Sequence, residues 1–210
     1  MARNERRKEQ RPEEILEAAI EEFAVRGYAQ TRLEDVASRA GISKGLVYVY
    51  FRTKEELFKA AIRTLLVPRV EALRKQLESS DETSEALIRG PVLSLMKQVV
   101  GSRLGYIVRL MVAEGAKHPD LTAFYHEQMI SRTMGLLRWI IARGVERGEF
   151  KPNPVMDFPQ LFVAPVLISL LWKMLLERHQ HLDAEKMLEA HIDIMLGALK
   201  REPALTPDRL

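Results

Sequence analysis

The chain has 210 residues, of which 47% are apolar and 29% charged, and it contains no cysteine. This composition is typical of a globular protein that buries its own core, and it excludes a disordered or low-complexity chain. The lack of cysteine excludes disulfides, zinc–cysteine sites and thiol nucleophiles, and it fits a reducing cytoplasm. The N-terminus has no secretory apolar stretch, and the longest uncharged run, Phe158–Trp172, is too short to span a membrane. We therefore expect a soluble, cytoplasmic protein.

The net charge of +3 is small, but the basic residues gather near the N-terminus. Residues 1–11 and residues 31–54 each hold five basic and two acidic side chains, so the rest of the chain is acidic. A basic N-terminal quarter favours a polyanionic partner at that end. The alternative is an ordinary solvated surface, which the charge distribution alone leaves open.

Helical periodicity dominates the sequence, and it predicts short helices at the N-terminal end. Pro12 suits the first turn of a helix whose apolar stripe stops at Gly27. Thr31 and Glu34 have the spacing of a capping box, in which each side chain accepts from a backbone N–H of the first turn. This pair is expected to open a second short helix, and Gly41 allows the sharp turn that follows it.

A long helix is predicted to begin at a second capping box, Thr53–Glu56. Pro68 lies inside its apolar pattern and should bend or break it, because proline removes a backbone hydrogen bond. Asp183 is expected to cap the last helix. Further helical stripes occupy the C-terminal part, at residues 87–100, 104–111, 120–148, 158–178 and 183–200.

The helices before and after Gly41 have the spacing of a helix-turn-helix, whose second helix enters the major groove of DNA. This second helix is predicted over residues 44–50, with Ser43 as its cap and with Val47 and Phe51 facing inward. Its outward side would then carry Lys44, Gly45, Leu46, Tyr48 and Val49. Lysines and tyrosine hydroxyls bond phosphates, and apolar side chains contact thymine methyl groups. The alternative for the two tyrosines, Tyr48 and Tyr50, is packing against the first helix.

The stretch from Thr31 to Leu57 resembles the TetR family of bacterial transcriptional regulators; it reads TRLEDVASRAGISKGLVYVYFRTKEEL. The match covers roughly residues 12–60, and the segment Ala113–Tyr125 resembles the ligand domains of some multidrug-type members. The resemblance implies an all-α fold: an N-terminal three-helix helix-turn-helix domain joined by a long helix to a C-terminal helical domain for ligand binding and dimerisation. We expect a basic arm, these two domains and a loose tail at residues 1–11, 12–58, 59–201 and 202–210.

The resemblance also implies roles in DNA binding. The residues expected to face the bases or the nearby backbone are Ser43, Lys44, Gly45, Leu46 and Tyr48, and those expected to contact phosphates are Thr31, Arg32, Tyr50 and Lys54. Leu46 stands where a small hydroxyl residue is usual, and Val49 where histidine is frequent, so base readout is expected to be more apolar. The basic arm has two interpretations: contact with phosphates or the minor groove, and a solubilising tail.

Two C-terminal helices have more apolar surface than a monomer needs. The helix at residues 158–178 is apolar nearly all round, and the helix at 183–200 has two apolar sides. Such helices favour two neighbours, namely their own core and a second copy of the chain. We expect a homodimer through these helices, the alternative being burial inside a larger monomer core. A dimer also suits DNA, because two recognition helices read half-sites about one helical turn apart.

The middle helices are expected to enclose a small-molecule pocket, as the resemblance implies. Candidate lining residues are Leu104, Ile107, Met111, Phe124, Met129, Trp139, Phe162 and Trp172, each of which also suits an ordinary core. Arg109 and Glu114 are charged residues beside an apolar stripe. They could contact a polar group of a ligand, pair with each other or face solvent. The five histidines are scattered, so neither a metal site nor a cofactor is expected.

These observations favour a sequence-specific transcriptional regulator, a repressor released from a palindromic operator by a small-molecule effector. A DNA-binding architectural protein without an effector is a second hypothesis. A helical carrier or enzyme is a third, although the sequence offers no Ser–His–Asp pattern, phosphate loop or dinucleotide motif, so no enzyme is expected.

Overall fold

The computed structural model describes the backbone of residues 2–200 and the side chains of residues 12–200. The expected tail, residues 202–210, lies outside this range. The helices in the described part are α1 (Ala2–Arg26), α2 (Leu33–Arg39), α3 (Lys44–Tyr50), α4 (Lys54–Ala61), α5 (Val67–Glu78), α6 (Ser84–Leu87), α7 (Leu93–Gly101), α8 (Leu104–Glu114), α9 (Pro119–Tyr125), α10 (Ser131–Glu146), α11 (Gln160–Leu175) and α12 (Ala184–Leu199). None of them is long and apolar enough to cross a membrane.

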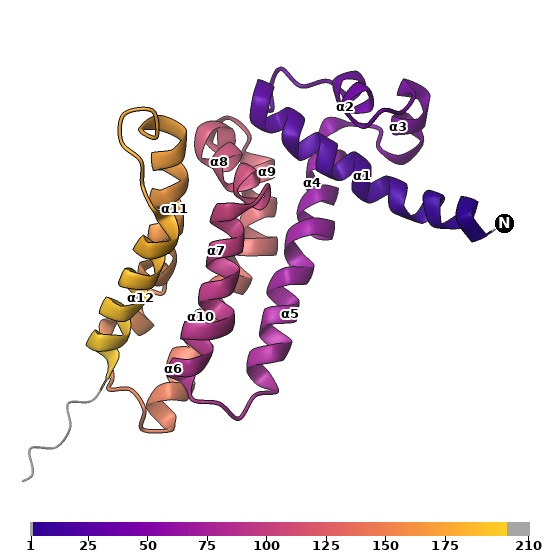
Figure 1. Ribbon diagram of the computed structural model, residues 1–210. Coiled ribbons are helices and arrows are strands. Elements are labelled where there is room, and N and C mark those ends of the chain that lie inside the picture. Colours follow the sequence, from indigo (N-terminus) through magenta and orange to yellow (C-terminus); the bar gives the residue numbers. More distant parts are fainter. Residues whose placement is uncertain (1, 201–210) are drawn as a thin grey trace, which may run out of the picture.

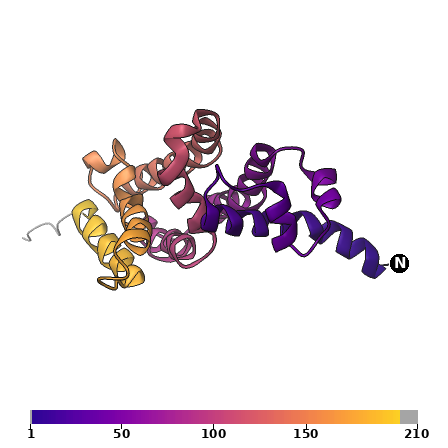
Figure 2. The ribbon, with the colours of Figure 1, turned by 90° about the horizontal axis from the view of Figure 1, so that it is seen from above.

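The helix-turn-helix lies at one end of the molecule, where α1 crosses α4 and packs against α2, and α2 in turn packs against α3 (Figure 1). Seen from above, this end lies opposite α11 and α12 (Figure 2). Gly27 ends α1 with a φ of 79°, and Gly41 turns the chain between α2 and α3 with a φ of 66°. Both φ values lie in the left-handed region that glycine adopts without a steric cost.

Helix α1 begins earlier than predicted, at Ala2, so Pro12 lies inside the helix and not in its first turn. Residues 2–11 contain many good helix formers, which explains the extension. The start of α2 also differs from the prediction. Asp35, not Glu34, accepts from the N–H at the cap, which is Arg32, with an N–O distance of 3.0 Å. Thr31 precedes the cap, and its hydroxyl donates elsewhere.

The long connecting helix continues from α4 into α5 without a break (Figure 1). Between α4 and α5 the chain forms a π-helical turn, Ile62–Leu66, in which the N–H of Val67 donates to the carbonyl of Ile62. Pro68 follows directly as the second residue of α5. Pro68 is expected to bend or break this helix; the helix is not broken, and the irregularity next to Pro68 is a π turn.

The C-terminal part packs α5, α7, α10, α11 and α12 around a second apolar core, with α11 and α12 side by side (Figures 1 and 2). The helix predicted at residues 120–148 is α9, a π turn and α10, and it stops at Gly148 with a φ of 73°. Asp183 caps α12 as predicted, accepting from the N–H of Lys186 at 3.1 Å.

The two domains share apolar packing where α1, α4 and α8 meet. Phe23 and Phe58 of the helix-turn-helix end belong to the same buried cluster as Leu104, Ile107 and Leu110 of α8. A displacement of α8 therefore presses directly on the core that holds the recognition helix, since close-packed interiors transmit strain.

Candidate DNA-binding surface and ligand cavity

Helix α3 is held so that one side is sealed and the other faces solvent. Val47 is fully buried, and Phe51 is nearly so, as the sequence predicts. The hydroxyl of Ser43 caps the helix by accepting from the N–H of Leu46 at 3.3 Å. On the outer side Tyr48 is 41% exposed and Val49 76%. Exposed apolar and aromatic surface on a short helix is costly in water and suits the edges of bases.

The carboxylate of Glu34, which its spacing from Thr31 suggested for a capping box, holds two of the predicted contact residues. Glu34 of α2 accepts from the ammonium of Lys44 at 2.5 Å and from the hydroxyl of Tyr48 at 3.2 Å. The bond from Lys44 lowers the pKa of Glu34 to about 2, and the same bond raises the pKa of Lys44. In the free protein Glu34 thus occupies the donors that a phosphate would use.

Two residues expected to contact phosphates have internal partners instead. Thr31 is only 2% exposed, and its hydroxyl donates to the carbonyl of Gly27 at 2.7 Å. The ammonium of Lys54 donates to the carbonyls of Tyr28 and Ala29, each at 2.7 Å, and burial lowers its pKa. Both residues therefore fix the loop between α1 and α2.

The remaining predicted residues differ in exposure. Arg32 and Gly45 are exposed, whereas Leu46 and Tyr50 are half-buried. The ring of Tyr50 packs on Phe51 with centroids 6.4 Å apart, so the alternative of internal packing holds in part for this tyrosine. A hollow of about 690 Å³ lies between the start of α2 and the end of α3; its walls carry four basic residues, Arg26, Arg32, Arg52 and Lys54, and two acids, Glu34 and Asp35. Arg52 is exposed and was not predicted as a contact, because nothing in its local spacing marks it.

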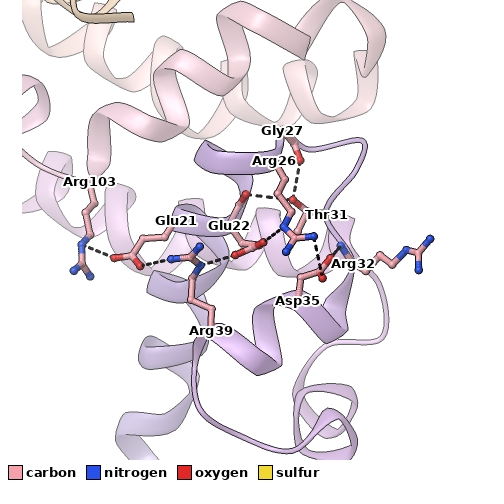
Figure 3. A network of polar contacts seen from close by, with 9 residues as sticks. All are labelled: Glu21, Glu22, Arg26, Gly27, Thr31, Arg32, Asp35, Arg39 and Arg103. Atoms are coloured by element: carbon pink, nitrogen blue, oxygen red, sulfur yellow. Dashed lines mark hydrogen bonds and ion pairs between the residues drawn. The ribbon is translucent and has the colours of Figure 1, made fainter.

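A chain of ion pairs fixes α2 against α1 (Figure 3). The buried carboxylate of Glu22 accepts from Arg39 at 2.5 Å and pairs with Arg26. Arg26 also pairs with Asp35 at 3.4 Å. A buried carboxylate is tolerated only when it is fully partnered, and Glu22 has a guanidinium on each of its oxygens. The recognition helix thus rests on a rigid support.

The same network reaches the C-terminal domain. Arg39 donates to Glu21 at 3.3 Å, and the other oxygen of Glu21 accepts from Arg103 at 2.8 Å (Figure 3). Arg103 directly precedes α8. A series of alternating charges therefore joins α8 through α1 to the end of α2.

Glu114 forms a second junction between the domains. Its carboxylate accepts from the backbone N–H groups of Tyr28 at 2.9 Å and of Ala29 at 3.1 Å. The ring of His118 contacts Tyr28 edge-on with centroids 4.7 Å apart. Burial, then Glu55 and Glu114 nearby, raise the pKa of Tyr28 to about 12. Of the partners that its sequence position left open, Glu114 does not meet Arg109, and its carboxylate stays partly exposed to solvent beside His118.

The C-terminal domain contains an almost wholly apolar cavity of about 390 Å³ between α5, α7, α8, α10 and α11. This size lies within the range of roughly 300–1,000 Å³ that small-molecule sites occupy. Of the predicted lining residues, Leu104, Met111 and Met129 lie on its walls.

The other predicted residues lie elsewhere, and we do not retain them as lining residues. Ile107 and Phe162 are fully buried in the cores. Phe124 lies beneath the guanidinium of Arg63 at 4.8 Å. Trp139 lies beside Arg143, and the indole of Trp172 donates to the carbonyl of Gln180. Apolar residues on one side of a helix give the same sequence pattern whether they face a core or a cavity. Among residues 12–200 no group of three metal-binding side chains gathers.

A capped recognition helix with an exposed mixed surface, mounted on a second helical domain with a cavity, defines the class of helix-turn-helix DNA-binding proteins that have a ligand domain. Comparison with known families agrees. The family model described as "Bacterial regulatory proteins, tetR family" matches residues 15–61, and "Tetracyclin repressor-like, C-terminal domain" matches residues 88–190. The chain belongs to the TetR family of transcriptional regulators. It is a DNA-binding transcriptional regulator with an all-helical fold, as the sequence predicts.

Individual relatives span nearly the whole chain. The HTH-type transcriptional repressor KstR2 of Mycobacterium tuberculosis is 25% identical over 193 residues, which are 90% of this chain and 92% of that protein. FadR from Bacillus subtilis, solved with stearoyl-CoA, has a TM-score of 0.73 at 18% identity, covering 88% of this chain and 97% of that one. SmeT, solved with triclosan, has a TM-score of 0.74 at 22% identity, covering 95% and 98%. At these identities the solved structures show a shared fold.

Proposed function

We propose that this regulator is a cytoplasmic repressor that binds a palindromic operator and is released from it by a small molecule in the cavity. The observation that supports the DNA-binding part of this proposal is the outer side of α3. Tyr48 and Val49 are exposed there, whereas Val47 is buried on the inner side. The relatives named as a repressor, and those solved with stearoyl-CoA and triclosan, support the regulatory half.

The proposed DNA contacts are the outer side of α3 together with basic residues around the adjoining hollow. We assign base and backbone contacts to Lys44, Gly45, Leu46 and Tyr48, and phosphate contacts to Arg32, Arg52 and the hydroxyl of Tyr50. Ser43, Thr31 and Lys54 act by holding this surface in place. A short helix reads few base pairs, so a single copy does not supply the roughly 4–10 kcal/mol that separates specific from non-specific binding.

A second copy of the chain would supply the rest. Helix α11 and its flanks, with α12, present large apolar side chains to solvent: Phe158, Leu161, Leu167, Ile168, Met174, Leu175, Leu176 and Ile194. An apolar patch of this extent marks an interaction surface, and its place opposite the DNA-binding end suits a two-fold axis (Figure 2). We propose that α11 and α12 of two copies form the homodimer interface.

The DNA-binding proposal is tested by gel shift with the DNA upstream of the protein's own gene, at low and high salt. We expect a complex that survives unlabelled non-specific competitor at the higher salt. The double variant Lys44→Ala/Tyr48→Ala should lose this complex, while Lys75→Ala, an exposed cation on α5, should keep it. Equal competition by any DNA would indicate an architectural role, and binding unaffected by the double variant would refute the assignment of α3.

A further inference from the structure

The apolar cavity lies beside a second, basic hollow. This second hollow has a volume of about 490 Å³, and Arg69 and Leu104 lie on the walls of both. Helix α11 contributes Leu167 to the apolar cavity and Lys173, further along the helix, to the basic one. The two hollows therefore adjoin; we call the apolar one the chamber and the basic one the mouth.

The mouth carries an excess of positive charge. Its walls hold the cations Arg69, Arg103, Arg109 and Lys173 and a single acid, Glu17. Arg103 is paired with Glu17 at 3.3 Å and with Glu21 at 2.8 Å. Within residues 12–200 the other cations have no acidic partner. Arg109 is half-buried, and its guanidinium lies over the Tyr106 ring at 4.3 Å, which holds it in place.

The chamber and the mouth make opposite demands on a ligand. The chamber offers almost no hydrogen-bonding groups, so a polar ligand placed inside would lose its water without replacement. The mouth offers charge-assisted donors that a carboxylate or phosphate satisfies better than water-exposed neutral groups do. A ligand that meets both demands has a hydrocarbon tail and an anionic head.

We propose that the effector is such an amphiphilic anion, with its tail in the chamber and its carboxylate or phosphate head against Arg69, Arg109 and Lys173. This assignment rests on the proposed function, because it takes the cavity as the effector site. A head in the mouth also competes with Glu21 for Arg103, and Glu21 is bonded to Arg39 of α2. The charge of the ligand thus has a direct route to the helix-turn-helix.

The test compares probes that share one tail and differ only in the head: dodecanoate, dodecyl phosphate, dodecanol and dodecyltrimethylammonium, all below the concentration at which they form micelles. Binding to the full chain is measured by displacement of the neutral dye Nile red. We expect both anions to bind roughly tenfold more tightly than the alcohol and the cation to bind most weakly. The ratio of the carboxylate to the phosphate affinity distinguishes the two head groups.

The variant Arg109→Gln/Lys173→Gln should lose the preference for anions while dodecanol binding stays unchanged. Lys75→Gln on α5 removes the same kind of charge away from both hollows and should keep the preference. In case the double variant fails to fold, the wild-type protein supplies a second readout, since high salt should weaken the anions and not the alcohol. Dodecanol binding as tightly as the anions, or an unchanged preference in a folded double variant, would overturn the proposal.

Operator binding, followed by fluorescence anisotropy in the same samples, separates this inference from the proposed function. An anion that binds in the predicted way and leaves the operator complex intact would overturn the proposed release and support the ligand class. Release by dodecanol at least as effective as release by the anions would overturn the ligand class and support release.

Discussion

The carboxylate of Glu114, at the end of α8, accepts a hydrogen bond from the backbone N–H of Tyr28 in the DNA-binding domain. Lys54 binds the carbonyl of the same residue from the opposite side, at 2.7 Å. The loop between α1 and α2 is therefore held by an anion from the ligand domain and a cation from α4. A movement of α8 pulls on this loop through hydrogen bonds as well as through the shared apolar core.

Glu114→Ala should loosen this junction. Hydrogen bonds to charged groups contribute about 1.5–3 kcal/mol, which corresponds to a fall in Tm of roughly 3–12 °C for a chain of this size. Thermal melting checks the shift, with Glu127→Ala, an exposed acid on the π turn after α9, as the control. A Tm that falls equally in both variants would show that the junction adds no stability.

Gly27→Ala should cost more than Gly41→Ala, although both place a side chain at a positive φ, a strain of about 1–3 kcal/mol. A β-carbon at Gly27 would lie 2.4 Å from Oε1 of Glu114, whereas nothing lies within 4 Å of one at Gly41. The carboxylate can swing aside, but it then loses its backbone partners. In the Glu114→Ala background the two alanine variants should therefore have nearly equal Tm values; a persistent difference would contradict this explanation.

Glu34→Gln should raise operator affinity a few-fold at low salt. The substitution removes a negative charge beside the DNA-binding surface and frees Lys44, which Glu34 now holds at 2.5 Å. Titrations of labelled operator at several salt concentrations measure the effect, which should shrink as salt rises. Glu127→Gln makes the same change in net charge far from α3, and an equal gain in that control would contradict a local role for Glu34.

Pro68→Ala should change the response to ligand more than the folding of the helix-turn-helix. The variant restores a backbone donor next to the π turn at residues 62–66 and so stiffens the connecting helix. We expect dodecanoate to weaken operator binding less than it does in the wild type, with a nearly unchanged Tm. Equal ligand-induced release in both proteins would count against a role for this turn in signalling.

Ile168→Glu should convert the proposed dimer to a monomer. Ile168 is 49% exposed on α11, and a carboxylate there would be desolvated opposite its own copy in a two-fold interface. Light scattering should give about the chain mass of 24.1 kDa for the variant and twice that mass for the wild type. The control Val25→Glu, which alters an exposed residue on α1, should also give twice the chain mass. A wild-type protein that is already monomeric at micromolar concentration would refute the interface.

Local signals in the sequence predicted local features well. Ser43, Val47 and Phe51 have the cap and the inward spacing that the structure shows, and Asp183 caps its helix. The junction at Glu114 was beyond such reasoning, because its partners lie 85 and 86 residues away in the chain.

The same limit explains the errors. Threonine is a residue type that commonly caps helices, yet α2 begins two residues after Thr31. The Thr31 hydroxyl instead donates back toward the end of α1. The tryptophans seemed suited to a cavity because periodicity identifies a buried side of a helix, not what that side meets. Which apolar side chains surround empty space depends on how helices cross, and a single sequence does not encode that locally.

The paired links from Arg103 to Glu21 and from Glu114 to the Tyr28 loop bear on attempts to re-engineer such proteins as biosensors. Fusing the DNA-binding domain of one relative to the ligand domain of another keeps both domains intact but separates these matched residues. A working hybrid would have to take both residues of each link from the same parent. Otherwise we expect it to bind DNA still but to lose its response to the ligand.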